Sequence, residues 1–255
     1  MHDPWFNLRQ FTQARIAQGR AGCALPTRAL LDFQLAHAAA RDAVHAPWQL
    51  AHCQASLTAL GMEVLTLATP IQSRAHYLQR PDQGRCLVEN SRKLLASRAT
   101  HSCDIAIIMS NGLSSAAVEQ HGVALLRTII TEFAKEPLQL APLCLVPNAR
   151  VALADEIGAL LHAKLSIIIV GERPGLSAAD SLGIYLTYAP QVGNSDAERN
   201  CISNIRPPHG MSYQLAAEKL FYLTQEALRR EISGVALKDE MPRLPLPHPT
   251  LPPKI

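Results

Sequence analysis

The sequence predicts an α/β fold: a Rossmann-like, mostly parallel sheet with helices on both faces, preceded by a mainly helical N-terminal region. Two observations predict this fold class. Between residues 104 and 188, short apolar segments rich in β-branched residues alternate with longer segments of helical spacing, and a long helical segment (211–230) follows. Before residue 100, segments of helical spacing dominate. Alternation of this kind is typical of parallel strands joined by crossover helices.

Three helices are predicted in the N-terminal region. The first covers residues 28–43, where Leu30, Leu31 and Leu35 recur at helical spacing and the charged residues can lie on the other face. The second covers residues 48–61. The third covers residues 81–99, because Pro81 suits the first helical position and Asp82 the first turn.

Four strands and three helices are predicted after residue 100. The strands cover residues 104–109, 138–146, 165–170 and 183–188. The first helix ends near residue 135, and the other two cover residues 151–163 and 211–230. We therefore divide the chain into a helical region (1–100), an α/β domain (101–235) and a proline-rich tail (236–255). Six of the 18 prolines lie in the last 15 residues, which predicts an extended polyproline-type segment, either a loose exposed tail or a ligand for a proline-binding domain.

The composition is globular and excludes several classes of protein. Of 255 residues, 48% are apolar and 18% are charged, which argues against a disordered or fibrous chain. The net charge is only +3 and no Lys/Arg-rich block occurs, which argues against nucleic-acid binding. No apolar run is long enough to span a membrane, and the N-terminus lacks a secretory signal. We expect a cytoplasmic protein.

The six cysteines are scattered and contain no CxxC pair. Zinc sites need clustered ligands, and small disulfide frameworks crowd their cysteines. We therefore expect reduced thiols, mostly buried, and no metal site in this chain.

Four loops are expected at the carboxyl edge of the sheet, where open α/β sheets bind ligands. They cover residues 110–115, 147–151, 171–175 and 189–204. The third contains two glycines around Glu172, Arg173 and Pro174, which predicts a polar ligand near Glu172. A solvated Glu172–Arg173 surface pair is an equally good interpretation at this point.

Familiar ligand motifs are missing: the chain has no Walker-type phosphate loop and no glycine-rich dinucleotide fingerprint. The segment after residue 111 distantly resembles a nucleophile elbow, so Ser114 with His209 and Asp180 is a candidate hydrolase triad. Capping of the following helix by Ser110 or Ser114 explains the same serines more simply.

Five motifs appear in order along the chain: TQARIAQGRAG (12–22), YLQRPDQGR (77–85), SNGLS (110–114), VGERPGL (170–176) and NCISNI (200–205). Together they closely resemble the small (light) subunit of ethanolamine ammonia-lyase, from about residue 11 to residue 234. The resemblance implies an ammonia-lyase, a carbon–nitrogen lyase, that converts ethanolamine to acetaldehyde and ammonia with adenosylcobalamin. Homolysis of the cobalt–carbon bond would give a 5′-deoxyadenosyl radical that takes hydrogen from the substrate.

The resemblance also implies a division of labour. The large subunit, a (β/α)8 barrel, would hold ethanolamine and the catalytic groups, and six large and six small subunits would assemble. In this chain, Val151, Glu172 and Cys201 match the family's cobalamin contacts. No Asp-x-His-x-x-Gly motif is present, so we expect the cofactor to keep its own dimethylbenzimidazole (base-on) and to take no metal ligand from this chain.

Two departures from the family bear on these expectations. Asn111 stands where the family often has aspartate, and we expect the loop to keep its shape. The N-terminal extension that directs some members into a bacterial microcompartment has no room before Thr12, so packaging there stays open. The alternatives to the lyase subunit are a non-catalytic corrinoid-binding or assembly protein, and an α/β hydrolase using Ser114.

Overall fold

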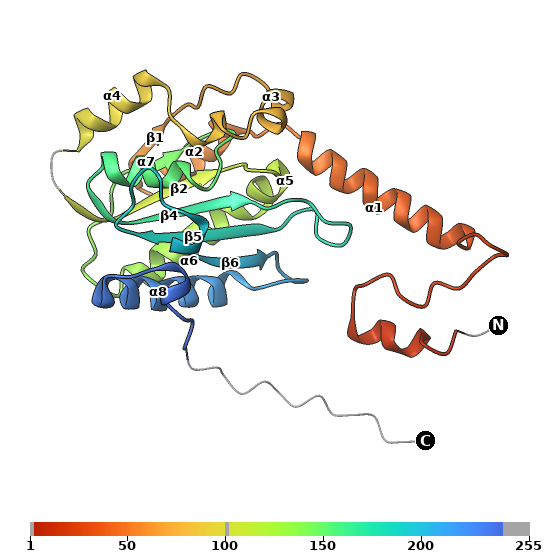
Figure 1. Ribbon diagram of the computed structural model, residues 1–255. Coiled ribbons are helices and arrows are strands. Elements are labelled where there is room, and N and C mark those ends of the chain that lie inside the picture. The colour runs from red at the N-terminus through yellow and green to blue at the C-terminus, as the bar shows by residue number, and fades with distance from the viewer. Residues whose placement is uncertain (1–2, 100–101, 242–255) are drawn as a thin grey trace.

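The computed structural model describes residues 3–99 and 102–241, and it contains a six-stranded sheet in the order β1-β3-β2-β4-β5-β6 (Figure 1). The strands are β1 (Val64–Thr66), β2 (Cys103–Ser110), β3 (Leu143–Leu145), β4 (Ala163–Gly171), β5 (Leu182–Tyr188) and β6 (Arg199–Ile205). The first four in this order are parallel neighbours, which confirms the predicted α/β class.

Helices cover both faces of the sheet, as predicted (Figure 1). They are α1 (Thr27–His45), α2 (Leu50–Thr58), α3 (Arg74–Gln79), α4 (Glu89–Arg98), α5 (Ser115–Ala117), α6 (Val123–Phe133), α7 (Leu153–Leu160) and α8 (Tyr213–Arg230), with a π-helical turn at Val118–Gly122. Side chains from α2, α6 and α8 pack on one face, and those from α4 and α7 pack on the other.

The strand sequences explain this two-sided core. Successive side chains of a strand point to opposite faces. Ile105 and Ile107 of β2 therefore join the cluster under α6 and α8, whereas Ala106 and Ile108 join the cluster under α7. Because both faces are covered, the central strands read as continuous apolar runs, which is why they were visible in the sequence.

The sheet is mixed rather than wholly parallel beyond β4. β5 pairs antiparallel with β4, and β6 pairs antiparallel with β5. The predicted loop 189–204 is therefore partly wrong: it begins at the opposite edge of the sheet, where Ala189 N bonds to Lys164 O at 2.8 Å, and it ends inside β6. The sequence did not predict β6, because it is an edge strand in which only Arg199, Ile202 and Ile205 are buried, so it has no continuous apolar run.

Several smaller expectations need correction. The helix predicted over 81–99 begins only at Glu89, since the preceding segment must bring Gly84 against Asn148 and Arg150. The short strand β1 was not predicted.

Only two cysteines, Cys53 and Cys144, are buried, so the expectation of mostly buried thiols is wrong. The proline-rich segment lies outside the described residues from position 242 onward, and the three-part division of the chain stays a prediction.

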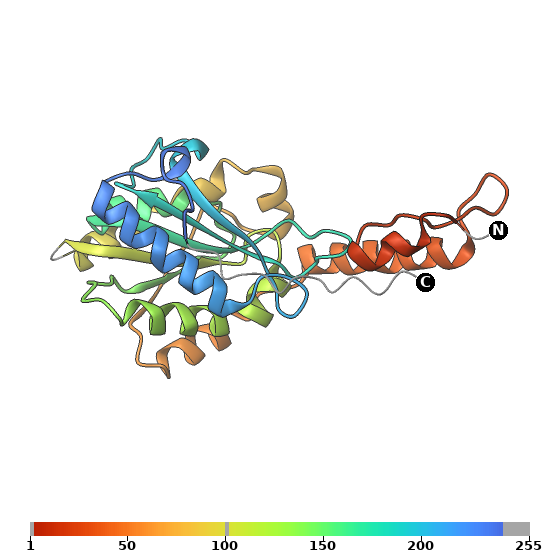
Figure 2. The same cartoon turned by 90° about the horizontal axis from the view of Figure 1, so that it is seen from below.

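Helix α1 and the segment before it project from the body of the molecule, and that segment turns back along the helix (Figure 2). We call residues 3–45 the N-terminal arm. The one buried residue of α1 is Ala43, near the end that joins the body. Within the described residues, no helix is both long and apolar enough to cross a membrane.

A buried ion pair ties α7 to the end of the sheet. Arg199 Nη2 donates to Asp155 Oδ2, and both side chains are almost fully buried. Arg199 also donates to the carbonyl oxygens of Asn194, at 3.0 Å, and of Ser195, which fixes the loop before β6. Burial raises the pKa of Asp155, and the Arg199 guanidinium opposes that shift.

We predict that Asp155→Ala lowers the free energy of unfolding by about 3–5 kcal/mol, because it removes the only buried carboxylate paired with Arg199 among the described residues and leaves the exposed Asp196. Urea denaturation followed by circular dichroism measures this. The matched control is Asp82→Ala, which removes the carboxylate of the exposed Arg80–Asp82 pair and should barely change the midpoint. Equal effects of the two variants would contradict the assignment.

Candidate functional site

Three predicted loops meet at the carboxyl edge, where β2, β3 and β4 end side by side. Two glycines bring the ends of β2 and β4 into main-chain contact. A Cβ atom on Gly112 would lie 2.2 Å from Val170 Cγ2, and one on Gly171 would lie 2.1 Å from Ser114 O. Gly112 also has φ of +48°, and Leu113 N donates to Gly171 O at 2.9 Å. Only glycine permits this approach at either position.

Asn111 joins the first loop to the second. Its Oδ1 accepts a hydrogen bond from Asn148 N at 2.7 Å, and its Nδ2 donates to Ser115 Oγ at 3.1 Å. Nearby, Ser110 Oγ accepts from Ala149 N at 3.0 Å. An aspartate in place of Asn111 could accept hydrogen bonds from the same two partners. Asparagine therefore preserves the hydrogen bonds that hold this loop.

Tyr77 is buried between two arginines beside these loops. Arg74 Cζ lies 4.8 Å and Arg150 Cζ 4.1 Å from the centre of its ring, and its hydroxyl donates to Ala149 O at 3.1 Å. Arg74 Nη1 donates to Gly112 O at 2.7 Å, and Arg150 Nη2 donates to Tyr77 O at 3.0 Å. The motif at 77–85 therefore builds one wall of the site, with cation–π contacts holding the guanidinium groups in place.

Two hollows adjoin at this edge and share Arg150, Val151 and Tyr185. The first has a volume of about 450 Å³ and also contains Cys201. The second has a volume of about 390 Å³ and also contains Glu172. The three residues predicted as a site, Val151, Glu172 and Cys201, thus border one continuous region of the surface.

Tyr185 and Cys201 face each other on β5 and β6. Burial raises the pKa of Tyr185, and the neighbouring Cys201 and Glu172 add to the shift. Burial likewise raises the pKa of the Cys201 thiol, although the residue is reachable from solvent. Both groups are therefore neutral near pH 7, and they offer hydrogen bonds rather than charge.

The Glu172 carboxylate is held by three donors of this chain. Ser203 Oγ donates to Oε1 and Ser181 Oγ donates to Oε2, each at 2.5 Å, and Asn204 N donates to Oε2 at 3.2 Å. Gly183 makes room for the side chain, since a Cβ there would lie 2.9 Å from Glu172 Oε1. A carboxylate can accept about four hydrogen bonds, so Glu172 keeps capacity for one more. Glu172 is therefore bonded to Ser181, Ser203 and Asn204, which does not fit the alternative interpretation of a solvated Glu172–Arg173 surface pair.

The first hollow carries positive charge. Arg85, Arg150 and Arg199 line it together with Asp196. Arg199 is paired with Asp155 and Asp196, whereas Arg85 and Arg150 have no ion pair within the described residues. Arg150 Nε is also buried without a hydrogen-bond partner in this part of the chain. The hollow can therefore donate to phosphate or carbonyl oxygens.

The hydrolase alternative gains no support from the geometry. Ser114 is fully buried, its hydroxyl donates to Ala179 O at 2.8 Å, and it caps α5 by accepting from Ala117 N. Asp180 contacts His121 and Arg206 rather than His209. A nucleophile must be reachable by its substrate, so the capping role predicted for Ser114 is confirmed.

Sequence reasoning missed the residues that frame the three predicted ones. Arg150 directly precedes Val151, and Tyr185 was seen only as part of a strand. Tyr77 and Arg85 belong to a motif that was recognised, but no role was assigned to it. No local sequence pattern predicts that these residues border the site, because their contacts join segments that lie far apart in the sequence.

Comparisons with known proteins agree with the resemblance in the sequence. The family model "Ethanolamine ammonia-lyase light chain (EutC)" matches residues 2–238. An ethanolamine ammonia-lyase small subunit from Azotobacter vinelandii is 52% identical over 241 residues, covering 93% of this chain and 89% of the relative. Small subunits from Pseudomonas fluorescens and Pseudomonas aeruginosa are 50% and 52% identical, each covering 93% of this chain and 88% of the relative.

We predict that Gly112→Ala destabilises the protein by more than about 2 kcal/mol, because it adds a steric clash to an unfavourable backbone conformation. The control is Gly61→Ala, where φ is +80° but nothing lies within 4 Å of the added Cβ. The backbone cost alone is about 1–2 kcal/mol. Thermal and urea unfolding compare the two variants. A smaller loss for Gly112→Ala than for Gly61→Ala would contradict the close contact with Gly171.

Proposed function

This chain belongs to the ethanolamine ammonia-lyase light-chain family, and we propose that it holds one side of an adenosylcobalamin cofactor against the large subunit of such a lyase. The surface on which Val151, Glu172 and Cys201 meet carries the proposal. The proposed enzyme converts ethanolamine to acetaldehyde and ammonia. Adenosylcobalamin, when bound, supplies the organic radical that starts the reaction.

The side chains of this surface suit the polar groups of a cobalamin. Glu172 can accept one more hydrogen bond, as from an amide side arm or a ribose hydroxyl. Arg85 and the unsatisfied Arg150 Nε can donate to the phosphate or to amide carbonyl groups. Val151 offers an apolar contact between the two hollows. The donor set therefore fits the cofactor.

Each hollow is smaller than a corrinoid with its side arms and opens at the surface. This chain therefore covers one side of the cofactor, and a second surface must cover the other. The names of the relatives say "small subunit", which implies a larger partner chain. In the proposal, the large subunit binds ethanolamine and supplies the catalytic groups, and six of each subunit assemble.

The role of this chain is then to bind, orient and shield the cofactor. It supplies no cobalt ligand, and the cofactor keeps its own dimethylbenzimidazole below the metal. Tyr185 and Cys201, both neutral, border the same surface without adding charge next to the corrin. The neutrality of these groups and the anchoring of Glu172 favour a fixed half-site over a proton-transfer role.

We predict acetaldehyde release from ethanolamine and adenosylcobalamin only when this chain is co-expressed with its cognate large subunit. The assay compares each subunit alone with the pair. Full activity of the large subunit alone would favour a non-catalytic corrinoid-binding or assembly protein. An inactive pair of correctly assembled subunits would overturn the proposed reaction.

We predict that Glu172→Ala weakens binding of cobalamin to the assembled complex by about tenfold or more, since hydrogen bonds to charged groups contribute most. Titration followed by the visible spectrum of the corrinoid measures the affinity. Glu240→Ala, a change to an exposed carboxylate outside both hollows, is the control. Size-exclusion chromatography checks that both variants still assemble. Unchanged affinity in an assembled Glu172→Ala complex would remove Glu172 from the site.

A further inference from the structure

The N-terminal arm exposes an unusual amount of apolar surface. Within the described residues, nine of the 17 exposed large apolar side chains lie between positions 5 and 35: Trp5, Phe6, Leu8, Phe11, Leu25, Leu30, Leu31, Phe33 and Leu35. Leu31 is 58% and Leu35 72% exposed, one helical turn apart on α1. A concentration of exposed apolar residues on one projecting element indicates a surface that another protein covers.

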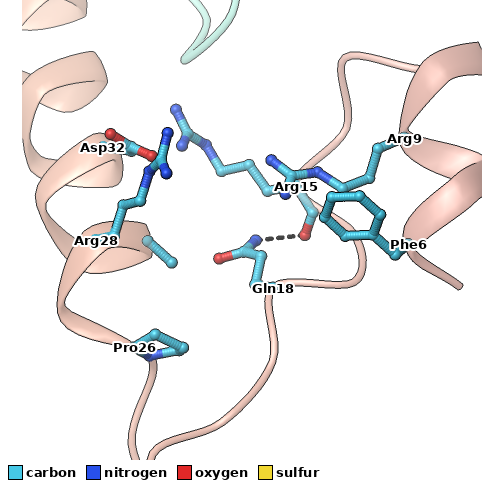
Figure 3. Close-up of a pocket in the computed structure, with 8 residues that line it drawn as sticks. Phe6, Arg9, Arg15, Gln18, Pro26, Arg28 and Asp32 are labelled. Carbon is cyan, nitrogen blue, oxygen red and sulfur yellow. Dashed lines mark hydrogen bonds between the residues drawn. The ribbon is translucent and has the colours of Figure 1, made fainter. Parts of the chain in front are cut away.

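The same arm carries a net positive charge. Residues 3–45 contain five arginines and three aspartates, and residues 4–31 hold four of these arginines and no acidic residue. Three of them, Arg9, Arg15 and Arg28, line a hollow of about 330 Å³ between the first segment and α1, together with Phe6 and Asp32. Figure 3 shows the side chains of Arg15 and Arg28 directed toward the same part of this hollow, with the Asp32 carboxylate beside Arg28.

Aromatic rings hold two of these guanidinium groups in place, but within the described residues no carboxylate forms an ion pair with any of the three. Arg9 lies over the Phe6 ring at 5.5 Å and Arg15 over the Phe33 ring at 5.8 Å. In the part of the chain that the structure describes, none of Arg9, Arg15 and Arg28 forms an ion pair. Three cations against the single Asp32 leave the hollow with room and charge for a carboxylate.

Charge argues against a second copy of the arm as the occupant. Two arms packed against each other would bring ten arginines together with only six aspartates, a net charge of +4. Like charges at a desolvated interface are costly. The matching surface must therefore be apolar and acidic.

The root of the arm adjoins the proposed cofactor site. Arg74 Nε donates to Val44 O at the end of α1, and Arg74 Nη1 donates to Gly112 O at the carboxyl edge of the sheet. From there the arm extends outward on the side where β2 and β4 end (Figures 1 and 2). A partner that closes over the half-site is therefore placed to contact the arm as well.

We propose that the arm docks on the large subunit, with its apolar side chains buried there and a carboxylate of that subunit bound between Arg9, Arg15 and Arg28. This proposal rests on the proposed function, because it takes the large subunit as the partner. The arm thereby adds a second attachment, remote from the cofactor, to an otherwise open half-site.

The test measures the dissociation constant of the full-length chain and its cognate large subunit by biolayer interferometry. We expect Arg15→Glu with Arg28→Glu, and separately Leu31→Gln with Leu35→Gln, to weaken binding by about tenfold or more. Arg127→Glu on α6 and Val235→Gln near the C-terminus change equally exposed positions of the body and should leave binding unchanged. Circular dichroism and thermal unfolding check the fold, which the arm variants should preserve because these side chains pack against nothing in the core.

The outcomes separate the two proposals. Arm variants that bind the large subunit as tightly as the controls would overturn the docking proposal and leave the lyase assignment intact. A wild-type chain that does not bind the large subunit at all would overturn both. Loss of affinity with rising salt should also be steeper for the wild type than for the Arg15→Glu, Arg28→Glu variant.

A photo-crosslinking amino acid at position 31 identifies the occupant directly. In the mixed complex we expect a product of small plus large subunit, and none from the same probe at position 235. A product of two small subunits from position 31 would show that a second copy covers the arm, and it would overturn the proposal.

Discussion

The main-chain contact between Gly112 and Gly171 is the constraint on which the rest of the site depends. It locks the loop after β2 against the end of β4, at a distance that no side chain could tolerate. Once that loop is fixed, Asn111 can hold Asn148, and Gly112 O can accept from Arg74. The positions of the second loop and of the root of α1 follow from this one contact between two strand ends.

The central strands of the sheet could be predicted because their burial leaves a local pattern in the sequence, whereas the edge strands could not. β2 and β4 are buried on both faces and therefore appear as uninterrupted apolar runs. β1 has three residues, and β6 reads RNCISNI, with polar side chains at most positions, so neither gives such a signal. The predicted helix start at Pro81 followed sound local rules, but the approach of Gly84 to Arg150 overrides them.

The site divides in the same way. Val151, Glu172 and Cys201 could be named from the sequence only through the family motifs, and the structure places them around adjoining hollows. The carboxylate of Glu172 is far from a free acceptor, since Ser181, Ser203 and Asn204 already bond to it. No periodicity or spacing encodes those bonds, because they join segments on three different parts of the fold.

The contrast between the body and the arm has a physical consequence for how the protein folds. The body buries two apolar clusters, one on each side of the sheet. α1 buries only Ala43, whereas most of the stability of helices in proteins comes from packing of an apolar face. At its root, α1 contacts α5, and Arg74 donates a hydrogen bond to Val44 O. In the docking proposal, the partner that covers its leucines stabilises α1, so ordering of the arm and assembly would be coupled, and the affinity of the complex would include the cost of that ordering.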